Sequence, residues 1–72
     1  MANPFEENYP VAAQWAEGGG WIEIGHPGHI EAFIAALDEG GLIWGGEKDY
    51  DSVDEALRDL ESGLAEWIEE NR

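Results

Sequence analysis

The last third of the chain carries the clearest hydrophobic pattern. Between residues 52 and 71, apolar side chains recur every three or four positions and acidic side chains fill most of the others. This is the period of a helix with one buried face. Ser52 followed three residues later by Glu55 is typical of a capped helix start. The pattern predicts an amphipathic helix over Ser52–Asn71 that buries Val53, Leu57, Leu60, Leu64, Trp67 and Ile68.

Two shorter elements are predicted before it. Pro10 followed by VAAQWAE indicates a short helix, which the Gly18–Gly20 run ends. The segment Trp21–Ile24, WIEI, lies between GGG and GHPG and is rich in β-branched and aromatic residues, so it predicts a strand. Residues 1–8 have little pattern and are expected to be a loose terminus.

The stretch FIAALDEGGLIWGG, Phe33 to Gly46, has two interpretations. The apolar spacing in 30–37 is helical and indicates a helix over residues 29–38, ended by Gly40. Alternatively, DEGG is a hairpin turn in which Asp38 begins the turn and a glycine forms a bulge, with Leu42–Trp44 returning as a strand. A sheet of only two strands would be marginal in water. We therefore predict the hairpin and keep a helix over 29–38 as the alternative.

These elements predict one α+β domain over residues 1–72, in the order α-β-β-β-α. A three-stranded antiparallel sheet packs against the long C-terminal helix, and close approach to the sheet would explain Gly63 in that helix. Alternation along the strands places three isoleucines on one face and Trp21 and Trp44 on the other. This second face needs a cover: the Trp15 helix, a second copy of the chain, or a partner.

Charge changes this picture most. The 72 residues include 17 acidic and 3 basic side chains, for a net charge of −14, so nucleic acid and anionic membranes should repel the protein. Cysteine is absent, which excludes disulfides and cysteine zinc sites. No run of 18 apolar residues predicts a membrane span, and the N-terminus has no signal-peptide pattern. We expect a small cytoplasmic protein with an acidic surface.

Catalytic signals are almost missing. The chain has no Cys or Thr, and its serines, Ser52 and Ser62, lie in the acidic helix. No enzymatic activity and no cofactor are therefore expected. His26 and His29 in GHPGH, with Glu23 or Glu31, are weak candidates for a surface metal site. The alternative is that both imidazoles lie in water on a glycine-proline turn.

The acidic face of the last helix departs from the charge distribution that stabilises a helix. Three glutamates, Glu66, Glu69 and Glu70, crowd the negative end of the helix dipole. The acidic residues recur every ~4 Å along the helix axis, close to the ~3.4 Å between phosphates of one DNA strand. The face therefore predicts mimicry of a nucleic-acid backbone, against the simpler interpretation of a solvated surface. Its residues are Asp54, Glu55, Asp59, Glu61, Glu66, Glu69 and Glu70.

The segments WIEIG, FIAALDEGGLIW and DYDSVDEALRDLESGLAEWIEEN resemble a group of short acidic bacterial proteins that is well represented in cyanobacteria. The resemblance covers Trp15 to Asn71. It implies the three-stranded sheet and no catalytic residues. GHPGH departs from the more acidic turn of that group, so any role of the histidines is particular to this chain.

We therefore predict a non-catalytic acidic protein that binds a basic protein surface, in its sharpest form as a nucleic-acid mimic or inhibitor. A homodimer through the sheet face is the alternative, and a metal-binding protein using His26 and His29 is a third, weaker one. Neither nucleic acid nor a membrane is expected to bind directly. The predicted partner-binding residues are Trp21, Trp44, Asp59, Glu66, Glu69 and Glu70.

Overall fold

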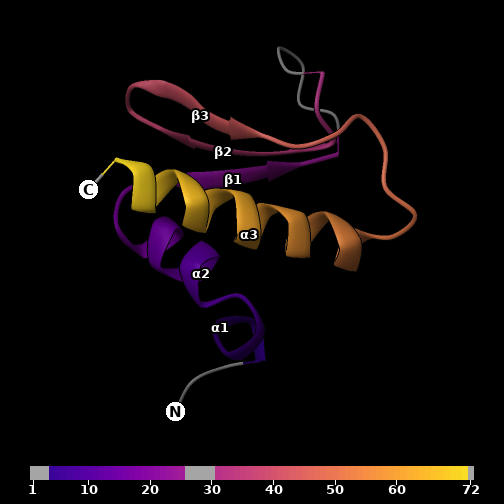
Figure 1. Ribbon diagram of the computed structural model, residues 1–72, viewed down its shortest axis with the longest axis horizontal. Helices are drawn as coiled ribbons and strands as arrows, with labels where there is room; N and C mark the ends of the chain where they lie inside the picture. Colours follow the sequence, from indigo (N-terminus) through magenta and orange to yellow (C-terminus); the bar gives the residue numbers. More distant parts are fainter. Residues whose placement is uncertain (1–3, 26–30, 72) are drawn as a thin grey trace.

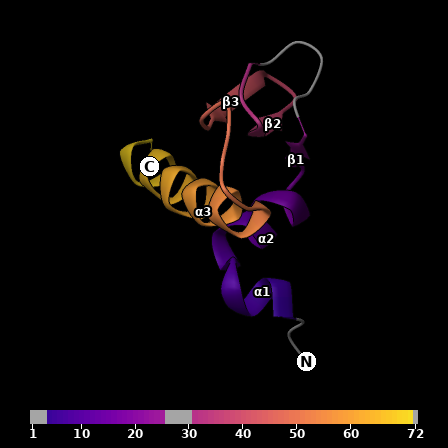
Figure 2. The same ribbon diagram turned by 90° about the vertical axis from the view of Figure 1, so that its right-hand side faces the viewer.

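The computed structural model describes residues 4–25 and 31–71, and within these it confirms the α+β fold. Three strands form one antiparallel sheet, a long helix lies against it, and two short helices precede it (Figure 1). The helices are α1 (Pro4–Asn8), α2 (Pro10–Glu17) and α3 (Val53–Glu70), and the strands are β1 (Trp21–Ile24), β2 (Ile34–Asp38) and β3 (Gly41–Gly45). Figure 2 shows α2 and α3 on the same side of the sheet and α1 farther from it.

The hairpin interpretation of the central stretch is confirmed, and a helix over 29–38 is wrong where that range is described. β2 and β3 are joined at the turn, where Asp38 Oδ1 accepts a hydrogen bond of 2.8 Å from the Gly40 amide. Gly41 takes the positive φ, 112°, that a side chain would resist.

β2 is the middle strand of the order β1-β2-β3, which explains why its sequence looked helical. Ile34, Ala35 and Ala36 are all fully buried. Three successive buried residues show no alternation, and a short apolar run of that kind cannot be told from a helix by periodicity.

The register of the strands decides which side chains share a face. Ile22 pairs with Ala36 and Ala36 with Trp44, so this row has one orientation. Trp21 pairs with Leu37 and Leu37 with Leu42, and this row has the other. β3 uses one more residue than β2 between these two rows, because the register shifts between Ala36 and Leu37.

The shift corrects the prediction that Trp44 lies on the same face as Trp21. Simple alternation put Trp44 opposite Ile43, but both residues pack against the core cluster beneath the sheet. A bulge adds a residue and so reverses the orientation of every side chain beyond it. Trp44 is therefore a half-buried residue at the interface with α3.

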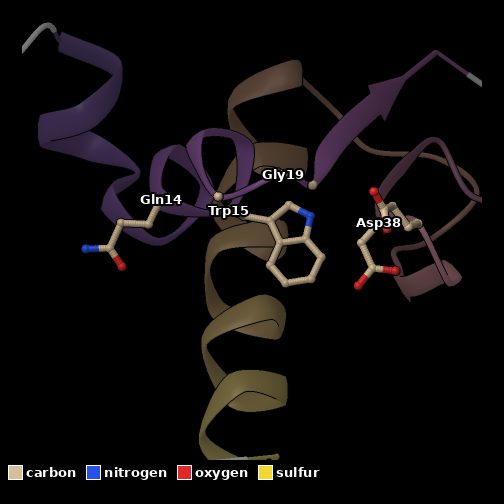
Figure 3. A pocket seen from close by; sticks show the side chains of 7 residues that line it. Gln14, Trp15, Gly19 and Asp38 are labelled. Atoms are coloured by element: carbon tan, nitrogen blue, oxygen red, sulfur yellow. The ribbon is translucent and has the colours of Figure 1, made fainter.

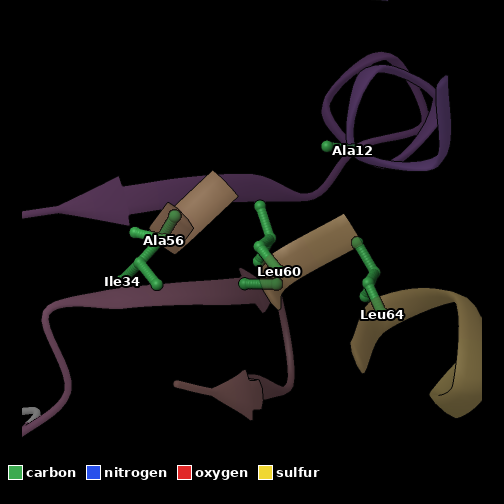
Figure 4. Close-up of a cluster of buried hydrophobic side chains, with 6 residues drawn as sticks. Ala12, Ile34, Ala56, Leu60 and Leu64 are labelled. Atoms are coloured by element: carbon green, nitrogen blue, oxygen red, sulfur yellow. The ribbon is translucent and has the colours of Figure 1, made fainter. Parts of the chain in front are cut away.

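The core lies between the sheet and the two helices. Its fully buried cluster takes Ala12 from α2, Ile34 and Ala36 from β2, and Ala56, Leu60 and Leu64 from α3 (Figure 4). The predicted face of α3 is confirmed from Leu57 to Ile68, whereas Val53 at the first turn is 50% exposed.

Gly63 lets α3 approach β3 closely, as predicted. A Cβ atom built on Gly63 would overlap the indole ring of Trp44. The glycine is therefore a packing requirement, and Trp44 is the residue that imposes it.

The short helix α2 is held by residues that are distant in sequence. Its own N-terminal residues provide no side-chain cap. Glu61 of α3 supplies one instead, since its two carboxylate oxygens accept hydrogen bonds from the Val11 and Ala12 amides at 2.8 and 2.9 Å. Trp15 packs edge-to-face on Trp67, with ring centroids 5.9 Å apart.

The helix α1 was not predicted from the sequence, where residues 1–8 were expected to be loose. Pro4–Asn8 forms a single short helix with no buried residue. The Asn8 side chain donates to the Pro4 carbonyl at 2.9 Å, and the Phe5 and Tyr9 rings lie 5.3 Å apart. These contacts are local, and no apolar stripe in the sequence indicates them.

Candidate interaction surface

The face of the sheet opposite α3 carries an apolar strip that runs across all three strands. It consists of Trp21, Leu37 and Leu42, which are cross-strand partners, and we call it the open-face strip. Trp21 is 43% exposed and Leu42 is 53% exposed, while Leu37 between them is half-buried. Within residues 4–25 and 31–71, no helix packs on this strip, because α2 and α3 both lie on the other side (Figure 2).

The helix α2, which carries Trp15, therefore does not cover Trp21, although it was one of the three covers that the sequence allowed. The position of Ala12 in the core shows that α2 joins α3 beneath the sheet. The tryptophan of α2 also points there: Trp15 Nε1 donates to the Leu37 carbonyl at 3.0 Å, while its ring contacts Trp67 of α3. A second copy of the chain and a partner remain as covers for the strip.

The exposed tryptophan is held in place by a carboxylate. Glu23 lies two residues along β1 and so on the same face, and its Oε2 accepts a hydrogen bond of 2.9 Å from Trp21 Nε1. This bond satisfies the polar edge of the indole. Its apolar face is then available for contact without an unpaired donor.

A hollow adjoins one end of the strip, and we call it the end pocket. It has a volume of about 380 Å³ and lies between the turn after α2 and the β2–β3 hairpin. Figure 3 shows the Trp15 indole between Gln14 and Asp38. The lining residues are Gln14, Trp15, Gly18, Gly19, Gly20, Asp38 and Glu39.

The acidic face of α3 is less continuous than the sequence suggested. Asp59 accepts a very short hydrogen bond from the Tyr50 hydroxyl, which also accepts one of 2.8 Å from the Glu47 amide. Burial of this hydroxyl and its bond to Asp59 raise the pKa of Tyr50 above its usual range. Asp59 and Glu61 thus both serve intramolecular contacts. Their use in the fold interrupts the regular row of charges on which the mimicry prediction rests.

The remaining carboxylates of the predicted partner-binding set lie at the C-terminal end of α3. Glu66, Glu69 and Glu70 are exposed there. The last carbonyls of the helix are capped by Asn71, whose side chain donates to the Trp67 carbonyl at 2.8 Å. This group of glutamates faces away from the sheet layer. It cannot touch a flat partner that covers the open-face strip, but it adds to the field that attracts one.

The candidate metal ligands His26 and His29 lie outside the described residues. Among the residues that are described, no three His, Asp or Glu side chains are placed to hold a metal ion. Over the same part of the chain, no helix is both long enough and apolar enough to cross a membrane.

Sequence reasoning missed most of this surface. Leu37 and Leu42 complete the strip, and Asp38 and Glu39 form one side of the end pocket. Only the strand register and the extra residue of β3 bring them together. The DEGG turn was the one available signal, and it was used for the fold alone.

Comparison of the chain with protein-family models, with curated proteins and with solved structures found no match.

Proposed function

We propose that the protein is a non-catalytic acidic interaction protein that binds a basic protein surface through its open-face strip. The observation that carries this proposal is an exposed tryptophan, Trp21, fixed by Glu23 on a sheet face that no described helix covers. Tryptophans in such positions are frequent anchors of protein interfaces, where they enter a pocket of the partner.

Charge supports a basic partner over a second copy of the chain. The net charge is −14, and no described carboxylate is buried, so the whole surface contributes to one negative field. Such a field speeds the encounter with a basic protein and opposes the approach of an identical chain. Glu23 lies on the same face as the strip, and Asp38 and Glu39 follow Leu37 at its end, so these carboxylates provide contacts for basic side chains near the strip.

The proposal favours the sheet face over mimicry of nucleic acid by α3. Mimicry needs an uninterrupted row of charges that are free to contact a partner, whereas Asp59 and Glu61 accept hydrogen bonds from other parts of the protein. Substituting Glu66, Glu69 and Glu70 with glutamine separates the two ideas. It should weaken binding modestly if these residues act only by long-range attraction, and abolish it if they are the contact surface.

The test is affinity purification from the native host with the wild type and with a Trp21→Ala/Leu42→Ser variant. We expect the wild type to retain basic proteins at low salt and to release them as the salt concentration rises. The Trp21→Ala/Leu42→Ser variant should not retain them. A matched control, Val53→Ser, changes an equally exposed apolar residue at the start of α3 and should retain them. Light scattering of the purified chain is run alongside.

Two outcomes would overturn the proposal. The first is equal capture by the wild type and the Trp21→Ala/Leu42→Ser variant. The second is a homodimer that persists at high salt and is broken by this variant, which would make a second copy the cover of the strip.

A further inference from the structure

The end pocket has the chemistry of a site for a planar cation. One wall is the indole of Trp15, and Asp38 lies across from it (Figure 3). Glu39 also lines the hollow. None of its lining residues is basic. A volume of about 380 Å³ is in the lower part of the ~300–1,000 Å³ range of ligand sites, which suits one side chain rather than a cofactor.

The Trp15 wall is fixed before any ligand arrives. Its Nε1 donates to the Leu37 carbonyl at 3.0 Å, and its ring meets Trp67 at an interplanar angle of 82°. An immobile aromatic ring attracts a cation without a further loss of side-chain entropy. Gly20 is needed beside it, since a Cβ atom there would overlap the indole.

The acidic side is also organised in advance. Asp38 is half-buried, and its Oδ1 is held by the Gly40 amide at 2.8 Å, which leaves Oδ2 for a donor. Glu39 is exposed beside it. A hollow lined by two acidic residues and an indole matches a guanidinium group, which stacks by its plane and donates from its edge, better than the compact ammonium of lysine.

We propose that the end pocket receives an arginine side chain of the basic partner. This inference rests on the proposed function, because the arginine is supplied by the basic partner proposed there. Gly20 precedes Trp21 in the chain, and Asp38 follows Leu37, so the pocket lies where the strands of the strip end. Trp15 lies on the helix side of the sheet, so the arginine must extend past the end of the strip to reach it. The strip supplies apolar area, and the pocket supplies selectivity for arginine.

The experiment uses the full chain labelled with ¹⁵N and a tri-arginine peptide with blocked termini as the probe. We expect the Trp15 indole N–H signal and the Gly18–Gly20 amide signals to shift on titration. Asp38→Asn/Glu39→Gln should weaken binding about fivefold or more, as expected for the loss of two partly exposed ion pairs. Asparagine at 38 can still accept from the Gly40 amide, so the hairpin should be retained. Tri-lysine should bind more weakly than tri-arginine.

The control variant Glu7→Gln/Asp54→Asn removes the same charge from exposed positions away from the pocket and should change binding less than about twofold. Equal weakening by both double variants, or shifts spread over the whole surface, would overturn the inference in favour of general attraction. Equal affinity for tri-lysine would remove the selectivity for arginine.

Failure of this inference is distinguishable from failure of the proposed function. Trp21→Ala/Leu42→Ser leaves the pocket intact and should still bind tri-arginine. If the peptide does not bind but partner capture still depends on Trp21, only the pocket assignment is wrong. If the peptide binds and capture does not depend on Trp21, the open-face strip is not the docking surface.

Discussion

Single residues at the interface of α3 with the sheet show how tightly the two layers are fitted. Gly63 and Trp44 are complementary: the absence of a side chain on one provides the space for the indole of the other. Asp59 of α3 accepts a hydrogen bond from Tyr50 of the loop that joins β3 to α3. These two contacts use residues that a helix-surface pattern would assign to solvent.

Gly63→Ala should destabilise the protein although alanine is the better helix former. The propensity gain is about 1 kcal/mol, whereas forcing a methyl group into the Trp44 ring costs roughly 1–3 kcal/mol. We expect a net loss of unfolding free energy, measured by urea denaturation. Ser62→Ala, at the neighbouring exposed position, is the control and should change stability by less than about 0.5 kcal/mol. An increase in stability for Gly63→Ala would show that the layers are not in close contact.

Tyr50→Phe should remove a pH-dependent part of the stability. The folded state raises the pKa of Tyr50, so above about pH 10 the unfolded chain loses this proton first and stability falls. The variant should be less stable than the wild type by about 1 kcal/mol at neutral pH. This difference in unfolding free energy between the two proteins should then narrow as the pH rises through the pKa that Tyr50 has in the folded state. Denaturant unfolding between pH 8 and 11 measures it, and a constant difference would contradict the assignment.

At the scale of elements, the helix α2 depends on a residue far away in the sequence. It has eight residues, too few to be stable alone, and it lacks a side-chain cap of its own. The Glu61 carboxylate satisfies two of its first amides, and the contact between Trp15 and Trp67 joins the opposite end to α3. α2 is thus stabilised mainly by tertiary contacts.

Glu61→Ala should loosen α2 selectively. The loss of an acceptor for two amides is expected to cost about 1–2 kcal/mol of unfolding free energy. Hydrogen exchange should accelerate at Val11 and Ala12 before it does in β2. Glu66→Ala, exposed on the same helix, removes the same charge and should leave both amides protected. Unchanged exchange in Glu61→Ala would show that water caps the helix equally well.

The elements themselves were largely predictable, because each has a local signal. The capping pair at Ser52 and Glu55 is present, with the Ser52 hydroxyl accepting from the Glu55 amide at 3.2 Å. The hairpin turn was recognised by its glycines. What failed was the orientation of Trp44, since the extra residue in β3 is set by pairing with β2 and leaves no mark in the sequence of β3 alone. The candidate site depends on the same pairing, so of its residues only Trp21 was placed on the open face from the sequence.

Across the whole molecule, the charged side chains mostly repel one another. Seventeen acidic side chains against three basic ones give a net charge of −14 on a chain of 72 residues. The described carboxylates all lie at the surface, where water and salt reach them. A compact state concentrates this charge more than an unfolded one, so charge opposes folding here while it favours solubility.

Added salt should therefore stabilise the fold. Raising sodium chloride from about 0.02 to 0.3 M shortens the Debye length from roughly 20 to below 10 Å, and we expect the thermal midpoint to rise. Potassium chloride at equal ionic strength should give the same increase, because screening does not depend on the cation. A midpoint that falls with salt would mean that attractive ion pairs outweigh the repulsion.

The cap that Glu61 places on α2 also orders events during synthesis. The amides of Val11 and Ala12 emerge from the ribosome some fifty residues before the carboxylate that receives them. The nascent N-terminal segment therefore cannot complete this cap until Glu61 has been synthesised, so α2 gains its full stability only after most of α3 has been translated.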